Sequence, residues 1–376
     1  MSVSLKTIFN PRPGWYKGDF HAHTTCSDGA FSPKGLRELA TEHGLDFLAI
    51  TDHNDVRAYD DFDGTLNRMV LPGVEVTLRE GHYNVFGFEG NTAKAQEFFQ
   101  SVIDLPPEIK YTLSREHAEI AALLQRIREA GLLIDIAHPL LWPWEWRDSQ
   151  TPLAWVDCVE LVNDPTYIGP PNATPNPKSY KSNFEANPAT LRMWSDWLNA
   201  GFRIIAVGGT DFHSLQPSDD RNRLSRLNLP FTFVYAYELS GLAVLDGVRK
   251  GHVYVTMGPK IEFRAFMNGW GYMMGDVLGE IKDPLHLYCR VESCPAGAQV
   301  KLIHNGETIA ETSVQDGKAA IDLRFTADAP PSGWYRLDVI GHDETIGHDG
   351  QLLAISNPIF MGPRCSPGAQ TFGEFL

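Results

Sequence analysis

Two histidines and one aspartate lie close together near the start of the chain, in the stretch WYKGDFHAHTTCSDG at residues 15–29. His21 and His23 flank one alanine, and Asp28 follows five residues after His23. Alternate residues of an extended strand share a face, so two aligned histidines can occur without any function. Because imidazole is also the commonest metal ligand in proteins, the question is whether the chain supplies further ligands.

Six more side chains that can bind metal follow, most of them where an apolar run ends in polar residues. They are His53 in ITDHND, Glu75 in LPGVEVT, His82 in REGHYNVFGF, His138 in IAHP, and Asp211 and His213 in GGTDFH. Each alone has an ordinary explanation, such as a loop histidine that caps a carbonyl. Together, six histidines and three carboxylates predict one shared metal site. Ligands of these types suit Zn, Mn or Fe, and Cys26 is not needed to complete the set.

Three similar segments are expected to position these side chains, each a helix followed by a short apolar strand. The first helix begins after Ser32 and ends at Gly44, the second ends at Gly131, and the third begins at Asn187-Pro188 and ends at Gly201. Each following strand leads into a candidate ligand. Alternating helices and buried strands indicate a parallel β/α architecture, whose active site forms at the carboxyl ends of the strands. An open sheet would also bind ligands there, but candidates spread over many strands favour a barrel.

The pattern changes after a last helix at Ser240–Lys250 and a strand that leads to Pro259. Beyond it, short alternating segments are separated by turn residues, and HNGET is typical of a hairpin turn. We therefore expect a first domain at residues 1–259 and an antiparallel β-sandwich at residues 260–376. The stretch from Tyr167 to Asn187 is expected to form a long loop near the site, which could act as a lid.

Composition and charge limit the partners. The formal net charge of -15 argues against nucleic-acid duplexes and anionic membranes, although bound metal ions could still attract an anionic small molecule. No apolar run has the length of a membrane span, and the first residues lack the apolar core of a signal peptide. Five cysteines show no disulfide framework. A cytoplasmic protein with a small-molecule substrate is expected, and it could form a homo-oligomer.

Five motifs, GDFHAHTTCSDG, AITDHND, PGVEVT, IAHP and GGTDFH, resemble those of the PHP (polymerase and histidinol phosphatase) family, over about residues 15–259. GHYNVFGF, KGHVYVTMGP and the expected sandwich are similar to the two-domain branch of that family, which includes carbaryl hydrolases. The resemblance implies a distorted seven-stranded (β/α)7 TIM-like barrel, followed here by the sandwich. It also implies a site for two or three divalent metal ions.

The resemblance further implies which side chains bind each ion. The first ion would be bound by His21, His23, Glu75 and Asp211. Glu75 would bridge to a second ion that is completed by His82 and His138. The third ion would be bound by Asp28, His53 and His213. Glu75 and His82 lie closer in sequence than in the small phosphatases of the family.

The expected reaction is hydrolysis by a hydroxide held between two bridged ions, in which Glu75, His138, Asp211 and His213 are the expected catalytic residues. Asp52 and Asp135 are expected to accept hydrogen bonds from histidine ligands, although Asp135 could be a plain core-edge carboxylate.

A small phosphorylated metabolite or nucleotide is the favoured substrate, because three ions match the charge that a phosphate ester develops. Arg221, Arg223 and Arg226, together with Arg57 and Arg79, flank ligands and could bind phosphate, or could form ordinary surface pairs. The alternative is a carboxylic or carbamic ester or an amide, for which Trp142, Trp144 and Trp146 could line an aromatic pocket or merely cover the barrel rim. A non-catalytic metal-binding or carbohydrate-binding protein is the third possibility.

Overall fold

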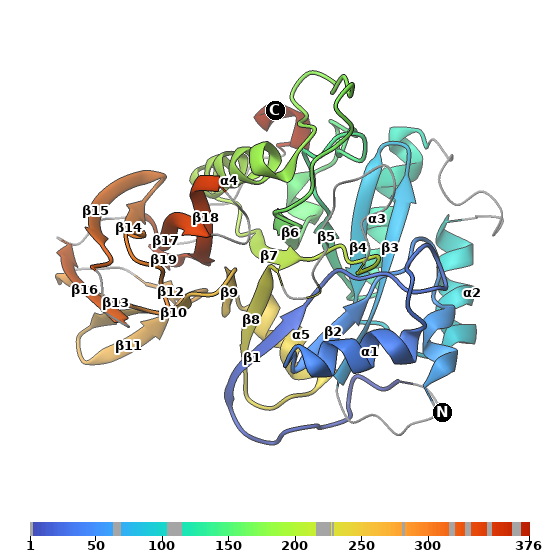
Figure 1. Ribbon diagram of the computed structural model, residues 1–376, viewed down its shortest axis with the longest axis horizontal. Helices are drawn as coiled ribbons and strands as arrows, with labels where there is room; N and C mark the ends of the chain where they lie inside the picture. The colour runs from blue at the N-terminus through green and yellow to red at the C-terminus, as the bar shows by residue number, and fades with distance from the viewer. Residues whose placement is uncertain are drawn as a thin grey trace.

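The computed structural model describes residues 3–62, 69–103, 115–215, 227, 229–279, 283–315, 320–327, 332–343, 348–362 and 370–376. Figure 1 shows two parts, a first part that carries the helices and a second part built of strands. The predicted α/β class with a C-terminal β domain is confirmed. Among the described helices, none has both the length and the apolar character to cross a membrane.

Parallel strands form most of the first part. β1 (Gly14–Asp19) pairs with β2 (Phe47–Ile50), and β2 pairs with β3 (Met69–Leu78). A second parallel run joins β5 (Leu133–Ile136), β6 (Cys158–Asn163) and β7 (Ile205–Gly209). All but β1 are buried along their whole length, as near-continuous apolar strands between helices should be.

One strand departs from the expected parallel order. β4 (Gly81–Phe86) runs antiparallel to both β3 and β5. Only Arg79 and Glu80 separate β3 from β4, and a two-residue connection can join only antiparallel strands. Gly81 has a φ of +119°, and a Cβ there would lie 2.7 Å from Trp146 Cα, so the turn requires glycine. This hairpin places Glu75 and His82 on adjacent strands despite their short separation in sequence.

The two ends of this strand path meet at the carboxyl edge. An isolated parallel bridge joins Ala22, after β1, to Phe212, after β7. β8 (Phe231–Ala236) pairs antiparallel with β1 on its other side, and β9 (Val253–Thr256) pairs with β8. A single bridge brings the ends together without a full ladder, so the closed seven-stranded barrel stays a prediction.

Helices pack around these strands largely where the sequence predicts them. They are α1 (Pro33–Glu42), α2 (Thr92–Ile103), α3 (His117–Glu129), α4 (Asn183–Asn199) and α5 (Gly241–Arg249), with short 3-10 turns η1 (Arg57–Asp61), η2 (Leu153–Trp155) and η3 (Phe372–Phe375). Ser32 caps α1 as expected, because its side chain accepts a hydrogen bond from Gly35 N. Ser240 caps α5 in the same way.

α4 begins at Asn183 rather than at Asn187, so the predicted start of this helix is wrong by four residues. The Asn183 side chain donates to Asn163 Oδ1 (2.8 Å) and to Asp164 O (2.9 Å), both at the end of β6. These bonds extend the helix toward its N-terminus, and Pro188 is accommodated inside the helix. The expected long loop therefore ends at Ser182.

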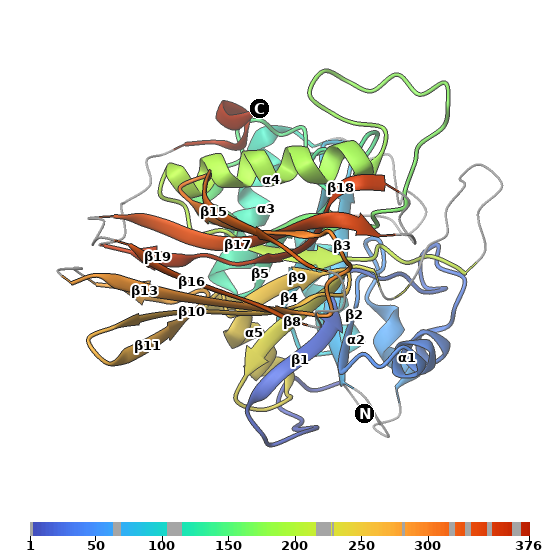
Figure 2. The same cartoon turned by 60° about the vertical axis from the view of Figure 1, so that its left-hand side comes forward.

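The second part has two layers of strands, which Figure 2 shows stacked. One layer has the order β11 (Trp270–Met273), β10 (Lys260–Met267), β13 (Leu285–Glu292) and β16 (Ala320–Ala327). The other contains β12 (Val277–Leu278), β14 (Gln299–His304), β15 (Glu307–Ser313), β17 (Gly333–Asp343), β18 (His348–Ser356) and β19 (Ile359–Met361). Inward side chains such as Phe263, Leu287 and Val339 form the core between the layers. The predicted hairpin at HNGET is confirmed, since β14 pairs with β15 through Asn305 and Gly306, both at positive φ.

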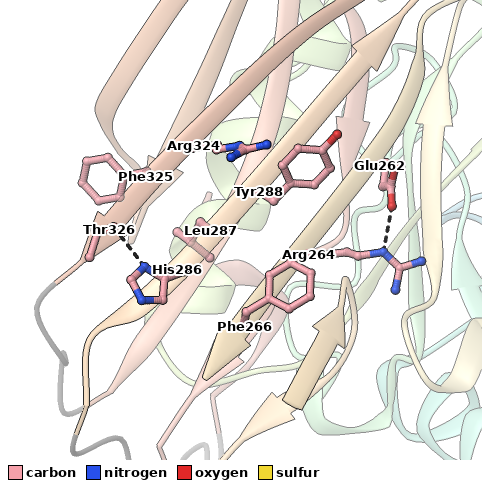
Figure 3. Close-up of a pocket in the computed structure, with 9 residues that line it drawn as sticks. All are labelled: Glu262, Arg264, Phe266, His286, Leu287, Tyr288, Arg324, Phe325 and Thr326. Atoms are coloured by element: carbon pink, nitrogen blue, oxygen red, sulfur yellow. Dashed lines mark hydrogen bonds and ion pairs between the residues drawn. The ribbon is translucent and has the colours of Figure 1, made fainter. Parts of the chain in front are cut away.

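The two parts are joined by strand pairing and by the C-terminal residues, which pack on the first part. β18 pairs with β9, so one continuous run of strands crosses the expected boundary at Pro259, which stays a prediction. After β19 the chain returns to the first part, where Phe372 packs against Trp197 (5.8 Å between ring centroids). The outer face of the four-stranded layer is exposed, and Figure 3 shows Arg264, Tyr288 and Arg324 side by side on it.

Candidate metal centre

Side chains from six strands of the first part converge at one edge. His21 and His23 follow β1, Asp28 lies in the loop after them, His53 follows β2, Glu75 is on β3, His82 is on β4, His138 follows β5, and Asp211 and His213 follow β7. A cavity of about 260 Å³ opens here. Its lining residues are Asp28, His53, His82, His138, Trp144, Asp211 and His213. The structure therefore brings all nine predicted ligand side chains to one place.

Glu75 lies at the centre of the cluster and is fully buried. Its Oε1 lies 2.9 Å from His82 Nδ1, 3.1 Å from His138 Nε2 and 3.4 Å from His21 Nε2. Its Oε2 lies 2.7 Å from His53 Nδ1 but has no hydrogen bond of good geometry. The two oxygens of one carboxylate thus face different histidines, as a bridging ligand requires.

His21, His23 and Asp211 form a second group beside Glu75. The two Nε2 atoms of His21 and His23 lie only 3.1 Å apart, and Asp211 Oδ1 lies 3.1 Å from His23 Nε2. His21 uses its Nδ1 to bond Glu160 Oε1 (3.1 Å), which directs its Nε2 toward His23 and Asp211. The Nε2 atoms of His21 and His23 and Asp211 Oδ1 face one another, so a cation between them would have three donor atoms.

The third group consists of the histidines around Asp28. Its Oδ1 lies 3.2 Å from His213 Nε2, 3.7 Å from His53 Nε2 and 3.9 Å from His23 Nδ1. His213 Nδ1 bonds the backbone oxygen of Asp211 (2.7 Å), which leaves its Nε2 free to face Asp28. The Asp28 side chain is 44% exposed, so this group lies nearest to solvent.

The groupings differ in part from those implied by the resemblance. Four sets of possible ligand atoms lie within 4.8 Å of one another: His23, Asp28, His53 and His213; His21, His23 and Asp211; His21, Glu75 and His138; and His53, Glu75 and His82. Asp28, His53 and His213 fall together as expected. His82 and His138 both adjoin Glu75 but fall in different sets. The assignment of each side chain to an individual ion remains a prediction.

The pKa shifts in the cluster favour the protonation states that bind cations. Burial opposes charge on Glu75, yet the surrounding histidines, chiefly His53 and His82, hold the pKa of this carboxyl well below its ordinary value. Burial, together with His213 and His53, lowers the pKa of His23 to about 3. Burial lowers the pKa of His82 to about 4 against the opposing pull of Glu75. These two imidazoles are neutral at pH 7, the form that binds metal.

Divalent metal ions fit this set of donors. Among the described residues that line the cavity there is no lysine or arginine to neutralise the carboxylates. His138 Nδ1 and Glu75 Oε2 are buried without hydrogen-bond partners, which is rare unless a further ligand completes the site. His138 and Asp211 have φ values of +29° and +49°, a strained backbone region that persists mainly at functional sites.

Glu160, on β6, is a supporting residue that the sequence reading missed. Its Oε1 bonds His21 Nδ1, and its Oε2 accepts the backbone N–H of His138 (2.9 Å). One buried carboxylate therefore orients two of the predicted ligands, which is the role of the partners behind metal ligands in other proteins. The sequence did contain a signal, because Glu160 is a lone acid in the otherwise apolar run CVELV.

The two predicted supporting aspartates have other partners. Asp52 accepts hydrogen bonds from Thr24 N (2.7 Å) and from the side chains of Thr24 and Ser27, so it shapes the loop after His23. Asp135 accepts from Asn84 Nδ2 (3.3 Å), and Asn84 lies 3.4 Å from His21 Nδ1. Neither aspartate bonds a histidine directly, and the prediction that they would is wrong.

Asp19, on β1, fixes the backbone next to two predicted ligands. It accepts hydrogen bonds from His21 N (3.1 Å) and Thr210 N (3.0 Å), and so links the backbones that precede two predicted ligands. Burial raises the pKa of this carboxyl to about 7 in spite of these hydrogen bonds.

The predicted substrate residues have mixed positions. Trp144 lines the cavity, whereas Trp142 does not, and Trp146 is buried in the core beside Tyr83. Arg57 is exposed, pairs with the largely buried Asp55 (2.6 Å) and donates to the backbone oxygen of Cys26. Arg221, Arg223 and Arg226 lie outside the described residues.

Comparison with known proteins is consistent with the motifs of the metal centre. Residues 19–137 match the model of the PHP domain family. The matched segment contains six of the nine predicted ligands and ends just before His138.

Similar proteins share this region and little more. A DNA polymerase/3'-5' exonuclease PolX from Bacillus subtilis (strain 168) is 49% identical over 41 residues, 11% of this chain and 7% of that protein. A phosphoribosyl 1,2-cyclic phosphate 1,2-diphosphodiesterase from Eggerthella lenta is 28% identical over 131 residues, 32% of this chain and 46% of that protein. The chain thus spans less than half the length of these curated relatives. A solved two-domain protein from Bacteroides vulgatus, which contains a predicted PHP-like metal-dependent phosphoesterase, is 14% identical with a TM-score of 0.47, over 93% of this chain and 95% of that chain.

Proposed function

We propose that this chain is a PHP-type metal-dependent phosphoesterase that acts on a small phosphorylated metabolite or nucleotide, since residues 19–137 match the PHP domain family. The observation that carries the proposal is the position of Glu75. Four histidine nitrogens surround its carboxylate at 2.7, 2.9, 3.1 and 3.4 Å, and all of these side chains are buried. Such a carboxylate serves best as a ligand shared between cations.

Two or three divalent ions, Mn, Zn or Fe, would be held by the nine predicted ligands. When bound, they would polarise the ester and make a water nucleophilic near neutral pH. The chain's own residues do the positioning. Glu160 fixes the ring of His21 and the backbone of His138, and the Asp211 carbonyl fixes the ring of His213. Asp28 and His213 lie at the open end of the cavity, where the substrate enters.

The relatives favour phosphate esters over other esters. The names of the two curated relatives describe phosphodiester cleavage, one by an exonuclease and one by a cyclic-phosphate diphosphodiesterase. A cluster of cations also matches the charge that spreads over the oxygens of a reacting phosphoryl group. We therefore propose that a phosphoryl group binds in the cavity beside Glu75.

Hydrolysis of a carboxylic or carbamic ester is the second candidate. One observation favours it, namely that Trp144 lines the cavity while no described lining residue is an arginine or a lysine. An aromatic wall suits an aryl leaving group, and phosphate sites usually include arginine.

Turnover of simple chromogenic substrates tests the proposal. Protein loaded with Mn or Zn should hydrolyse p-nitrophenyl phosphate or its diester, and Glu75→Ala should lose that activity while remaining folded. Faster turnover of p-nitrophenyl or naphthyl esters than of phosphates would replace the first candidate by the second. Metal binding without turnover of any of these compounds would count against both candidates.

A further inference from the structure

A second cavity lies where the first part of the molecule meets the strands of the second part. Its volume is about 470 Å³. Ile205, the first residue of β7, lines it, whereas Asp211 lies two residues beyond the other end of that strand. At about 3.3 Å per residue, the metal centre is roughly 20 Å away. The two sites are therefore separate, and the second is at the amino-terminal end of the strands.

Basic side chains dominate this cavity. Arg203, Arg249 and Lys250 line it, and Asp276 is the one acidic residue among its described lining residues. Both carboxylate oxygens of Asp276 are already occupied, one by His252 Nε2 (2.9 Å) and the other by Met273 N (2.8 Å). Lys250 Nζ also pairs with Asp246 Oδ2 (2.6 Å), and Arg249 donates to Gly131 O (2.8 Å). The three cations still outnumber the two carboxylates Asp246 and Asp276, so this place keeps an excess of positive charge in a chain of net charge -15. Guanidinium groups bind phosphate oxygens in pairs, so the cavity suits a phosphoryl group.

Aromatic rings adjoin these cations. The guanidinium of Arg203 lies 4.9 Å from the ring centroid of Phe360, and Lys250 Nζ lies 5.5 Å from that of Tyr237. Tyr237 is 65% exposed, which is unusual for so large a ring. An exposed ring beside a phosphate-binding charge is suited to stack on a planar group of the same ligand.

Close backbone contacts form the cavity before any ligand arrives. Gly275 has a φ of +92°, and a Cβ there would lie 2.2 Å from Lys250 O, so only glycine allows the two segments to meet. Gly275 N donates to Pro358 O (2.7 Å), and Phe360 N donates to Asp276 O (2.9 Å). These bonds join the turn between β11 and β12 to β19 and the residues just before it, and a preformed site loses little free energy to ordering on binding.

We infer that this cavity binds a small phosphorylated molecule with a planar ring, such as a nucleotide, at a site distinct from the metal centre. Arg203, Arg249 and Lys250 bind the phosphoryl group, and Tyr237 stacks on the ring. The inference does not depend on the proposed phosphoesterase function, because no residue of the metal centre takes part.

Calorimetric titration of the metal-loaded protein with adenosine 5'-monophosphate, and separately with inorganic phosphate, tests this inference. Wild-type protein is expected to show two classes of site for the nucleotide. The double variant Arg249→Gln/Lys250→Gln, at two exposed positions, should weaken one class at least tenfold, and Glu75→Ala should remove the other. Arg290→Gln, an exposed arginine paired with Glu292 on the second part, is the matched control and should change neither class.

Tyr237→Ala separates the two parts of the ligand. It should weaken binding of the nucleotide and leave binding of inorganic phosphate unchanged. Equal loss of both would overturn the role of the ring. Unchanged nucleotide binding in the double variant, or loss of all binding in Glu75→Ala, would overturn the site itself. If instead the metal centre proves inactive, the class of site that depends on Arg249 and Lys250 should still be present, so the two proposals fail separately.

Discussion

The metal centre and the outer face of the four-stranded layer both carry many charged residues, but in opposite settings. In the metal centre, Glu75 is fully buried among imidazoles, and no described lining residue of the cavity is a lysine or an arginine. On the outer face, Arg264 pairs with Glu262 at 2.8 Å and Arg290 pairs with Glu292 at 2.9 Å, all partly exposed. Figure 3 shows this open face, on which the dashed line from Glu262 ends at Arg264.

The two regions differ in how their charges are neutralised. The exposed pairs neutralise each other and contribute little to the free energy of folding, because water and salt screen them. Buried carboxylates without a cation are costly, so a cluster such as that around Glu75 persists only if something positive completes it. A cluster of charged residues alone therefore does not identify a ligand site in this molecule. A buried carboxylate cluster that lacks a lysine or arginine partner among its described lining residues does.

The largest expected effect is at the centre of the buried cluster. Glu75→Ala should reduce hydrolysis by more than about 100-fold, since loss of a mere supporting residue behind a ligand can cost that much. Rates with p-nitrophenyl phosphate at saturating Mn or Zn measure it. Glu292→Ala, on the outer face, removes a similar carboxylate and should stay within about twofold of wild type. A similar loss in both variants would erase the contrast between the two regions.

Proton release upon metal binding is the next effect. Although burial opposes it, Glu160 raises the pKa of His21 and Glu75 raises that of His53, so both imidazoles carry protons over a wider pH range in the metal-free protein. Metal must displace these protons, whereas His23, with a pKa of about 3, has none to lose at neutral pH. Apparent metal affinity should therefore rise with pH until both imidazoles deprotonate, by up to about tenfold per pH unit for each proton released. Calorimetry in buffers of different ionisation enthalpy would count the protons, and a count of zero would contradict this charge balance.

A smaller loss of metal affinity is expected when a residue that orients the ligands is changed. Glu160→Gln keeps the shape of the side chain but removes the charge behind His21, and it should weaken metal binding by about 10–100-fold. Competition with a chromogenic chelator measures this affinity. Asp157→Asn is the matched control, because Asp157 bonds Ile134 N (2.9 Å) just before β6 and contacts no predicted ligand. Equal affinities in the two variants would reduce Glu160 to a structural role.

The smallest effect is expected on the outer face. Arg264→Gln breaks an exposed pair and should change the free energy of unfolding by less than about 1 kcal/mol. Urea denaturation followed by tryptophan fluorescence provides the measurement. A loss above about 2 kcal/mol would mean that this face is covered and matched like an interior, which would weaken the comparison.

The sequence predicted four of the five described α-helices, but not α2, and it predicted the convergence of the nine side chains, because both follow from local patterns. Helix caps such as Ser32 and apolar runs such as FLAI are visible in the chain, and polar residues at the ends of parallel strands must share an edge. The antiparallel direction of β4 was not predicted. The alternating helices and strands around it suggested parallel strands, and the two-residue turn at Arg79-Glu80 was not used as a sign of a hairpin.

Features that depend on several distant segments could not be read in advance. Trp144 rather than Trp142 lines the cavity, which depends on how the chain turns after His138. The roles of Asp52 and Asp135 depend on which polar group reaches each carboxylate first, and Thr24 and Asn84 do so here. The basic cavity gathers Arg203, Lys250 and Asp276 from three separate segments, and no motif in the sequence connects them.

The central claim is that the buried cluster around Glu75 is completed by metal ions. Elemental analysis by plasma mass spectrometry, after growth with Mn, Zn and Fe and removal of loose ions, tests it most directly. About two to three divalent ions per wild-type chain and a clear loss of ions in Glu75→Ala are predicted. A wild-type chain without bound metal, or the same metal content in both proteins, would contradict it.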